Sequence, residues 1–328
     1  MGSLNYKISF IGLVILIAIF SYINLFVFPN YISPYQSWTN SNNFFVFNEF
    51  RLPKTLTAIF VGAALSLSGL ILQQLFKNKL AGPYVLGVSS GASLFVEISI
   101  IGASIFNVQL LSQSYSISMA GLMGALLVIL LLIAVSKKTG FSHTILLFGV
   151  VLSQIIGACQ VFLDYLANPN ELKLFSLWTM GTFSNVNNVQ LVFLSSVILI
   201  GLIWAFYLMK PLQTFILGED IAKTLGVNTK SVSIQLMLCT GVLTGVSTAF
   251  CGPIAFIGMA IPNLVKLMFK TSNHQVLFWF SILLGSLMAL ICDTVGNSNW
   301  FSVQLPINVT SSMIGGPFIL YILLSKKQ

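Results

Sequence analysis

The chain has 328 residues, of which 56% are hydrophobic and 7% charged, whereas a typical soluble domain carries about 25% charged residues. A soluble core of this size could not bury so much apolar surface, so the composition excludes a soluble globular protein and predicts a multi-pass membrane protein. The net charge of +8 does not indicate nucleic-acid binding, because the cations stand singly or in pairs between apolar runs.

Ten apolar stretches are candidate membrane spans, since a helix needs roughly 20 residues to cross a bilayer. The first stretch ends at Pro29 and is too long for the apolar core of a signal peptide. The shortest contains Pro262 and is either a full crossing or a tilted half-helix. We therefore expect an all-α, polytopic membrane protein with one transmembrane domain over residues 1–328. The predicted spans are 8–28, 52–76, 84–106, 116–135, 144–166, 189–209, 231–251, 253–269, 276–296 and 307–325.

The basic residues predict the orientation of these spans. Of the 15 lysines and arginines, all but Arg51, Lys54 and Lys173 fall on the same side as the N-terminus. Because Lys and Arg collect in cytoplasmic loops, we expect both termini to be cytoplasmic. The cations assigned to that side are Lys7, Lys77, Lys79, Lys137, Lys138, Lys210, Lys223, Lys230, Lys266, Lys270, Lys326 and Lys327.

No constellation in the sequence indicates enzyme chemistry, a metal site or a cofactor. The cysteines lie in or beside apolar runs without zinc spacing, which is typical of small buried hydrophobic residues. His143 and His274 fall in predicted loops and neither has an adjacent glutamate. The sequence also lacks a G-x-x-x-x-G-K-[ST] loop, so another chain must bind ATP if transport uses it.

Three acidic residues fall within predicted spans, where ionisable side chains are rare and often functional. Glu97 lies inside the third span, and Asp164 and Asp293 lie near outer ends. A carrier driven by an ion gradient would use Glu97 as a relay together with broken helices. The alternative is that the two aspartates are interfacial and Glu97 lines a polar seam.

Three Gly/Pro-rich segments predict breaks in spanning helices: 86–91, 252–258 and 315–318. Irregular backbone survives in a membrane only when it is buried in protein or faces a water-filled cavity. The segments therefore indicate either helix kinks or the lining of a conduit. The candidate gate residues are Gly87, Ser89, Ser90 and Gly91.

The predicted inside loop at 210–230 contains one short helix between two glycines. Glu219 and Asp220 favour its N-terminus through the helix dipole, and Ile221 and Leu225 form an apolar stripe. Such a helix fits docking on a soluble partner, although it could instead pack on its own chain. The residues assigned to this contact are Gly218, Glu219, Asp220, Ile221, Leu225 and Gly226.

Four blocks of sequence, in this order, carry a resemblance to a known family. They are RLPKTLTAIFVGAALSLSGLILQQLFKNKLAGPYVLGVSSGA, GEDIAKTLGV, GPIAFIGMAIPNLVKLM and LPINVTSSMIGGPFILYILL. The chain resembles, over nearly its whole length, the permease subunits of bacterial ABC importers for iron-siderophores, haem and cobalamin. Compared with that family, Lys79 and Asn263 replace the usual Pro and His, and Asn297 stands where an arginine is expected.

The resemblance implies the membrane subunit of an ATP-driven importer for a ferric-siderophore or related chelate in the bacterial cytoplasmic membrane. It implies a dimer with a second copy or a paralogue, and ATP-binding subunits docked on the short helix of the inside loop. It also implies an extracytoplasmic substrate-binding protein that docks at Arg51 and Lys54. The missing arginine at Asn297 removes one expected docking cation.

Overall fold

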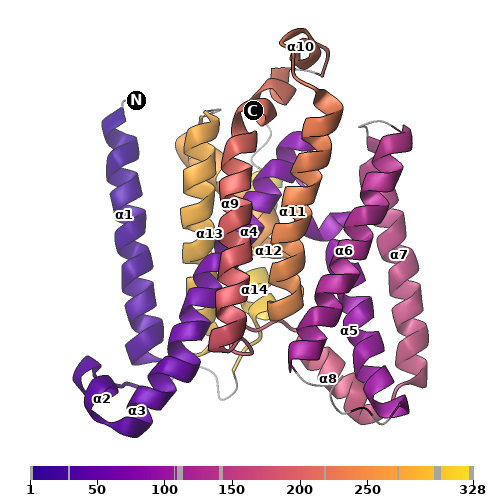
Figure 1. The fold of residues 1–328 in the computed structure, drawn as a ribbon. Helices are drawn as coiled ribbons and strands as arrows, with labels where there is room; N and C mark the ends of the chain where they lie inside the picture. The colour runs from indigo at the N-terminus through magenta and orange to yellow at the C-terminus, as the bar shows by residue number, and fades with distance from the viewer. Residues whose placement is uncertain are drawn as a thin grey trace.

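The computed structural model describes residues 3–28, 30–106, 108, 114–139, 143–217, 219–271, 273–298 and 304–324. Within these ranges every regular element is helical, and the long helices run roughly side by side (Figure 1). Eight helices in the described ranges are long and apolar enough to cross a membrane, and two shorter apolar helices accompany them. The expected all-α membrane architecture is therefore confirmed.

The helices of the bundle have the following bounds. They are α1 (Ser3–Tyr22), α2 (Pro34–Thr39), α3 (Ser41–Val46), α4 (Leu52–Leu75), α5 (Val88–Ile105), α6 (Ser114–Thr139), α7 (His143–Leu166), α8 (Pro169–Thr179), α9 (Asn188–Leu217), α10 (Glu219–Thr224), α11 (Thr229–Cys251), α12 (Phe256–Phe269), α13 (His274–Gly296) and α14 (Ile307–Leu324). The short elements between them are the π-helical turns η1 (Ile23–Val27) and η2 (Phe47–Arg51) and the 3-10 turn η3 (Pro83–Leu86).

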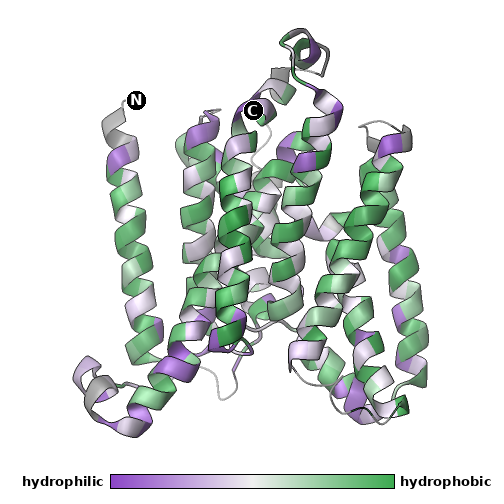
Figure 2. Cartoon of the chain, in the orientation of Figure 1, coloured by the Kyte–Doolittle hydropathy of each residue, from purple (hydrophilic) through white to green (hydrophobic). Residues whose placement is uncertain are grey.

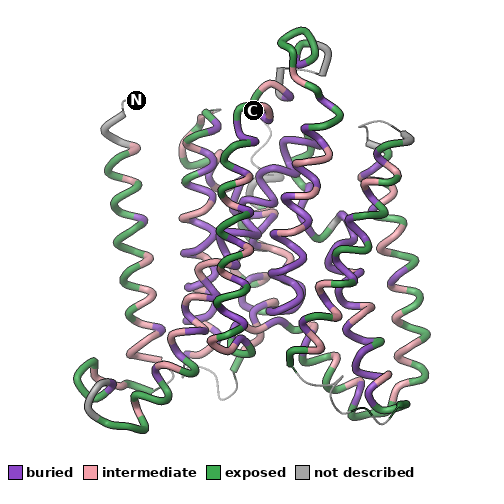
Figure 3. The backbone as a smooth tube through the Cα atoms, viewed as in Figure 1, coloured by how far each residue is buried: buried purple, intermediate pink, exposed green. Residues whose placement is uncertain are grey.

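Helix α4 forms the centre of the bundle and packs on α9, α11, α12 and α13. Glycines permit its closest contacts: a Cβ at Gly62 would overlap the backbone of Gly285, and one at Gly69 would overlap that of Gly258. Hydrophobic residues dominate the middle of the long helices (Figure 2), and burial is greatest in the central ones (Figure 3). In membranes such small-residue contacts let helix backbones approach closely.

The second span begins earlier than the sequence indicates. The segment before it folds as α2 and α3, whose N-caps Ser33 and Asn40 accept hydrogen bonds from the backbone amides of Gln36 and Asn42. Helix then continues from α3 through η2 into α4, so residues 41–75 form one unbroken run. Arg51 therefore lies within a helix and not at its open end.

The segment 210–230 is mostly helical. Helix α9 extends to Leu217 with Pro211 inside it, and α11 begins at Thr229, which leaves the expected short helix α10 between them. Helix α10 lies at the same end of the bundle as the start of α1 and the end of α14 (Figure 1). We call this end the α10 end. Lys326 and Lys327, which were assigned to this side, lie outside the described residues.

Helix α8 marks the opposite end, here called the α8 end, and its sequence signal is a capping box. Asn168 and Glu171 bond reciprocally at its first turn, with 2.9 Å between the Asn168 amide nitrogen and the Glu171 carboxylate. Burial alone would raise the pKa of Glu171, but hydrogen bonds from Ser104 and Asn168 outweigh it and lower that pKa.

Two of the three predicted helix breaks are present. Gly87 follows η3 with φ of 79°, and Gly252 precedes α12 with φ of 76°, conformations that favour glycine. The third prediction is wrong, because α14 continues through Pro317 without interruption. Pro and Gly are tolerated in membrane helices when neighbouring groups compensate, and Gly315 lies against Phe256.

An asparagine fixes the turn from which the family proline is missing. The Asn78 side chain accepts a hydrogen bond of 2.9 Å from the Leu80 amide, as in an Asx turn. Asn263 donates to the Lys79 carbonyl at 2.8 Å and so fastens the turn to α12. Lys79 and Asn263, which replace the family proline and histidine, are therefore joined by one hydrogen bond.

Candidate functional site

A cavity of about 440 Å³ lies where the two helix breaks meet α7 and α14. Tyr84 belongs to the turn before Gly87, and Pro253 belongs to the break after Gly252, so irregular backbone from both sides reaches this cavity. Irregular backbone at membrane depth is expected only around such a cavity. We call it the α7–α14 pocket, and its lining residues are Tyr84, Ser93, Gly157, Gln160, Val161, Asp164, Phe175, Thr179, Pro253, Ala255, Asn308 and Ser312.

Helix α7 contributes a polar face to this pocket. Gly157, Gln160 and Asp164 follow helical spacing, and no heavy atom lies within 4 Å of where a Cβ on Gly157 would point. Other positions on α7 expose large apolar side chains such as Val151 and Phe162. The helix is thus apolar toward lipid or a second subunit and polar toward the pocket.

Helix α14 is fastened to the second break by Asn308. Its side-chain amide donates to the carbonyl of Thr179 at 2.9 Å and to that of Pro253 at 2.6 Å. These bonds satisfy backbone acceptors at the end of α8 and in the break, where no helical partner is available. Asn308 therefore holds three segments of the pocket wall together.

The predicted gate residues lie next to the pocket but do not line it. Ser89 bonds to Thr248 on α11, with 3.2 Å between the hydroxyl oxygens, and Gly91 packs directly on Gly124 of α6. Gly87 lies against α7, and Ser90 is half-buried. Ser93, one turn after Ser89, lines the pocket instead. Its i+4 spacing from Ser89 is the sequence signal that could have identified it.

Glu97 and Asp164 face each other across α5 and α7. Glu97 is 1% exposed, neither of its oxygens makes a hydrogen bond of standard geometry, and it interacts with Gln160 and Asp164. Ser93 and Glu97 on α5 thus oppose Gln160 and Asp164 on α7. The sequence singled out both acids but could not bring them together.

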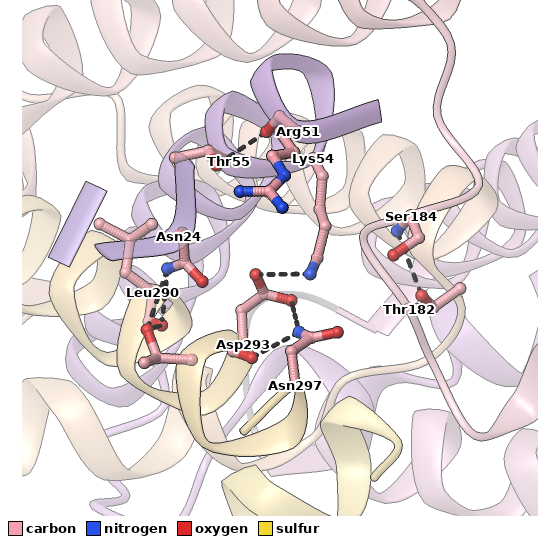
Figure 4. Close-up of polar contacts among 10 residues, drawn as sticks. Asn24, Arg51, Lys54, Thr55, Thr182, Ser184, Leu290, Asp293 and Asn297 are labelled. Atoms are coloured by element: carbon pink, nitrogen blue, oxygen red, sulfur yellow. Dashed lines mark hydrogen bonds and ion pairs between the residues drawn. The ribbon is translucent and has the colours of Figure 1, made fainter. Parts of the chain in front are cut away.

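At the α8 end, Lys54 pairs with Asp293 inside the bundle (Figure 4). The Lys54 Nζ lies 3.1 Å from Asp293 Oδ2, and the two side chains are 17% and 2% exposed. Asn297 donates to the other oxygen of Asp293 at 3.0 Å. Asn297, which stands where the family has an arginine, therefore helps to hold Asp293 in place for the ion pair.

Arg51 is committed to backbone carbonyls. Its guanidinium donates to Leu25 at 2.8 Å and to Asn30 at 2.6 Å, and the residue is 7% exposed. These bonds join the start of α4 to the end of η1. The guanidinium was expected to face a partner protein, but in this subunit it is occupied internally.

A second cavity, of about 620 Å³, lies at the α8 end. Asp293 and Asn297 form part of its polar wall, and Trp178 of α8 and Phe250 of α11 contribute apolar surface. The Lys54–Asp293 pair therefore lies beside an open space and not in a closed core.

Helix α10 projects beyond the rest of the bundle at the α10 end (Figure 1). Ile221 and Leu225 are 49% and 60% exposed, whereas Ala222 is fully buried, and Gly226 ends the segment with φ of 80°. The apolar stripe therefore keeps about half of its surface exposed in the single subunit. Glu219 and Asp220 open α10, and Gly218 lies outside the described residues.

The described residues contain no cluster of three or more His, Cys, Asp or Glu side chains that could hold a metal ion. Cys239, Cys251 and Cys292 are buried as expected, but Cys159 on α7 is exposed. The expectation for Cys159 is wrong because α7 packs on few neighbours in the single subunit, which an apolar run in the sequence does not reveal.

Comparisons with known proteins identify the fold and the family. The model of the FecCD transport family matches residues 10–325. The chain is 32% identical to the hemin transport system permease protein HmuU of Yersinia pestis, over 89% of this chain and 87% of that protein. It is also 32% identical to the vitamin B12 import system permease protein BtuC of Salmonella newport, over 97% and 95% of the two chains.

A solved structure supports the same assignment. The chain from an inward-facing metal-chelate type ABC transporter superposes with a TM-score of 0.87 at 26% identity, covering 97% of this chain and 99% of that one. The family match, the helical bundle and the order of the sequence blocks agree, and the chain belongs to the FecCD transport family.

Proposed function

We propose that this chain is the membrane-spanning subunit of an ATP-driven importer that carries a ferric-siderophore, or a related chelate such as haem or cobalamin, into the cytoplasm. The observation that carries the proposal is α10, an amphipathic helix that projects from the bundle with Ile221 and Leu225 exposed. Exposed apolar side chains on a short, protruding helix are suited to a protein partner. Because the sequence has no phosphate-binding loop, that partner would supply ATP binding and hydrolysis.

The assembly we infer contains two membrane subunits, identical or paralogous. Helix α7 exposes much of its surface in the single subunit, and its apolar positions could face a second copy. In this arrangement the α10 end is cytoplasmic, both termini are cytoplasmic, and the membrane is the bacterial inner membrane. The excess of lysine at the α10 end supports that orientation.

A substrate-binding protein would dock at the α8 end. Of Arg51 and Lys54, Lys54 is the more exposed cation, so it is the candidate for a direct contact with an acidic partner. In that contact Lys54 would leave Asp293 and pair with the partner instead. Arg51 would act by holding α4 against the end of α1. A rim charge of this kind guides and orients a partner more than it adds affinity.

Transport would follow from movement around the two helix breaks. Closure of the ATP-binding subunits would push on α10, and the helices around Gly87 and Gly252 would shift and open the α7–α14 pocket. A ligand moves such an equilibrium only through different affinity for the two states. The segment from Gly87 to Gly91, including Ser89 and Ser90, is the proposed gate because it couples α5 to α6, α7 and α11.

The rival function is a carrier driven by an ion gradient, favoured by the facing pair of Glu97 and Asp164. The test is uptake of ferric-siderophore into liposomes that contain this subunit, its ATP-binding subunit and its binding protein, with and without internal ATP. Uptake that requires ATP and both partners supports the importer. Uptake by this chain alone, driven by a proton or sodium gradient, would establish the carrier instead.

A further inference from the structure

The α7–α14 pocket has an unusual charge for a cavity formed by apolar helices. Asp164 lies in its wall, Glu97 interacts with Gln160 and Asp164 of that wall, and the described residues that line the pocket include no lysine or arginine. The side-chain amides of Gln160 and Asn308 add neutral polar groups. The pocket therefore presents acidic and neutral groups without a balancing cation.

Glu97 supplies an independent observation that points to a ligand. Its side chain is almost completely buried, both carboxylate oxygens lack a standard hydrogen bond, and it is directed at two residues of the pocket wall. Asp293 and Glu171, two other buried acids in the described bundle, both have donors: Asp293 has Lys54 and Asn297, and Glu171 has Asn168. The groups that interact with Glu97 are the Gln160 amide and a second acid, Asp164. Two acids placed together in this way are stabilised when a cationic group or a donor enters the adjacent space.

The aromatic residues of the wall fit the same kind of ligand. Tyr84 is half exposed at the pocket, and Phe175 lines it while stacking on Trp178. Faces of aromatic rings attract ammonium and guanidinium groups. Acidic side chains, side-chain amides and aromatic rings together form a set that suits organic cations.

We propose that the α7–α14 pocket binds a positively charged group on the cargo, so that this permease passes cationic chelates in preference to anionic ones. The proposal rests on the proposed function as an importer and narrows its substrate class. Gly157 leaves open space in the pocket wall, and a volume of about 440 Å³ suits a side arm of a chelate and not a bare ion alone.

The test uses one chelate prepared in three forms that differ in the charge of one arm. Ferrioxamine B carries a free amine; acetylation makes the arm neutral and succinylation makes it anionic. Each form is loaded on the binding protein beforehand, and a single turnover of ATP-driven uptake is measured in liposomes, so that the selectivity of the binding protein is removed. We expect the amine form to be transported about tenfold faster than the succinylated form. The acidic pocket attracts the cationic arm and repels the anionic one, and in a partly hydrated site the two interaction energies differ by an amount of this order.

The variant Glu97→Gln with Asp164→Asn should bring the three rates to within about twofold of one another. Asp164→Asn alone, at a half-exposed position, should narrow the difference if the double variant fails to fold. Glu49→Gln, which removes an exposed carboxylate away from the pocket, should leave the order unchanged. All variants are compared at equal amounts of monodisperse protein.

Equal rates for the three forms, or an order that Glu97→Gln with Asp164→Asn does not alter, would overturn the proposal. So would ATP-driven uptake confined to neutral cargo or to anionic cargo such as haem with its two propionates. Failure of the proposed function has a different signature, since uptake would then proceed without ATP and without the partner subunits.

Discussion

Helices α4 and α7 are both long, apolar and uncharged at their centres, yet α4 is mostly buried in the bundle and α7 is mostly exposed. In the most apolar stretch of the 41–75 run 83% of residues are buried, whereas the corresponding figure for α7 is 17%. Two glycines let the backbone of α4 contact the backbones of α12 and α13 directly, whereas Gly157 on α7 faces open space. Helix α4 is built as a fixed centre, and α7 is built as a wall with a polar side toward a cavity.

The largest expected effect comes from filling a glycine contact of α4. Gly69→Leu places a side chain where the backbone of Gly258 lies, and α4 has little room to move aside, because Gly62 fixes it on Gly285. We expect a loss of stability above about 3 kcal/mol and little folded protein. The control is Gly157→Ala on α7, which meets no atom within 4 Å and should keep the melting temperature of the purified subunit. Equal losses for both variants would remove the distinction between the two helices.

The ion pair between α4 and α13 comes next. Lys54→Met leaves Asp293 buried without its partner, which should destabilise the subunit by about 3–5 kcal/mol. Adding Asp293→Leu removes the orphaned charge and should restore most of the melting temperature. If the double variant is as unstable as the single one, the cost lies in packing and not in the unpaired carboxylate.

A third prediction concerns the exposed helix. Ile221→Asp with Leu225→Asp should leave the fold intact, because both side chains are about half exposed or more. Association with the ATP-binding subunit should weaken by about 100-fold, since contact residues of this kind contribute more than 1 kcal/mol each. Co-purification and a titration of ATPase binding measure this.

The matched control adds the same two charges at the α8 end, as Tyr31→Asp with Tyr35→Asp, at positions 66% and 77% exposed. This pair should not change association with the ATP-binding subunit. Normal co-purification of the α10 variant would contradict the coupling role and leave α10 as a surface helix.

The smallest effect concerns the cap of α8. Because the pKa of Glu171 is lowered in the folded chain, its carboxylate stabilises α8 at neutral pH. That contribution is present above the ordinary value of 4.5 and is lost as pH falls through the lowered pKa. Pepsin should therefore cut within α8 increasingly as the pH falls below that ordinary value, and Glu171→Gln should make cleavage less dependent on pH. An unchanged pH profile in the variant would assign the effect to another group.

The sequence by itself determined the membrane class, most of the spans, the short helix α10 and two of the helix breaks. These depend on local properties: apolar length, a dipole-matched first turn, and glycines whose φ of about 80° other residues seldom adopt. The same local rule gave a wrong prediction for the third break, since α14 continues as a helix through Pro317.

Only the tertiary structure decided what the ionisable residues face. Arg51 and Lys54 look alike in the sequence as outside cations, but packing gives one to backbone carbonyls and the other to Asp293, 239 positions along the chain. Glu97 and Asp164 become neighbours only because α5 lies against α7. Charge pairing depends on contacts between distant helices, and hydropathy along the chain carries no information about which helices meet.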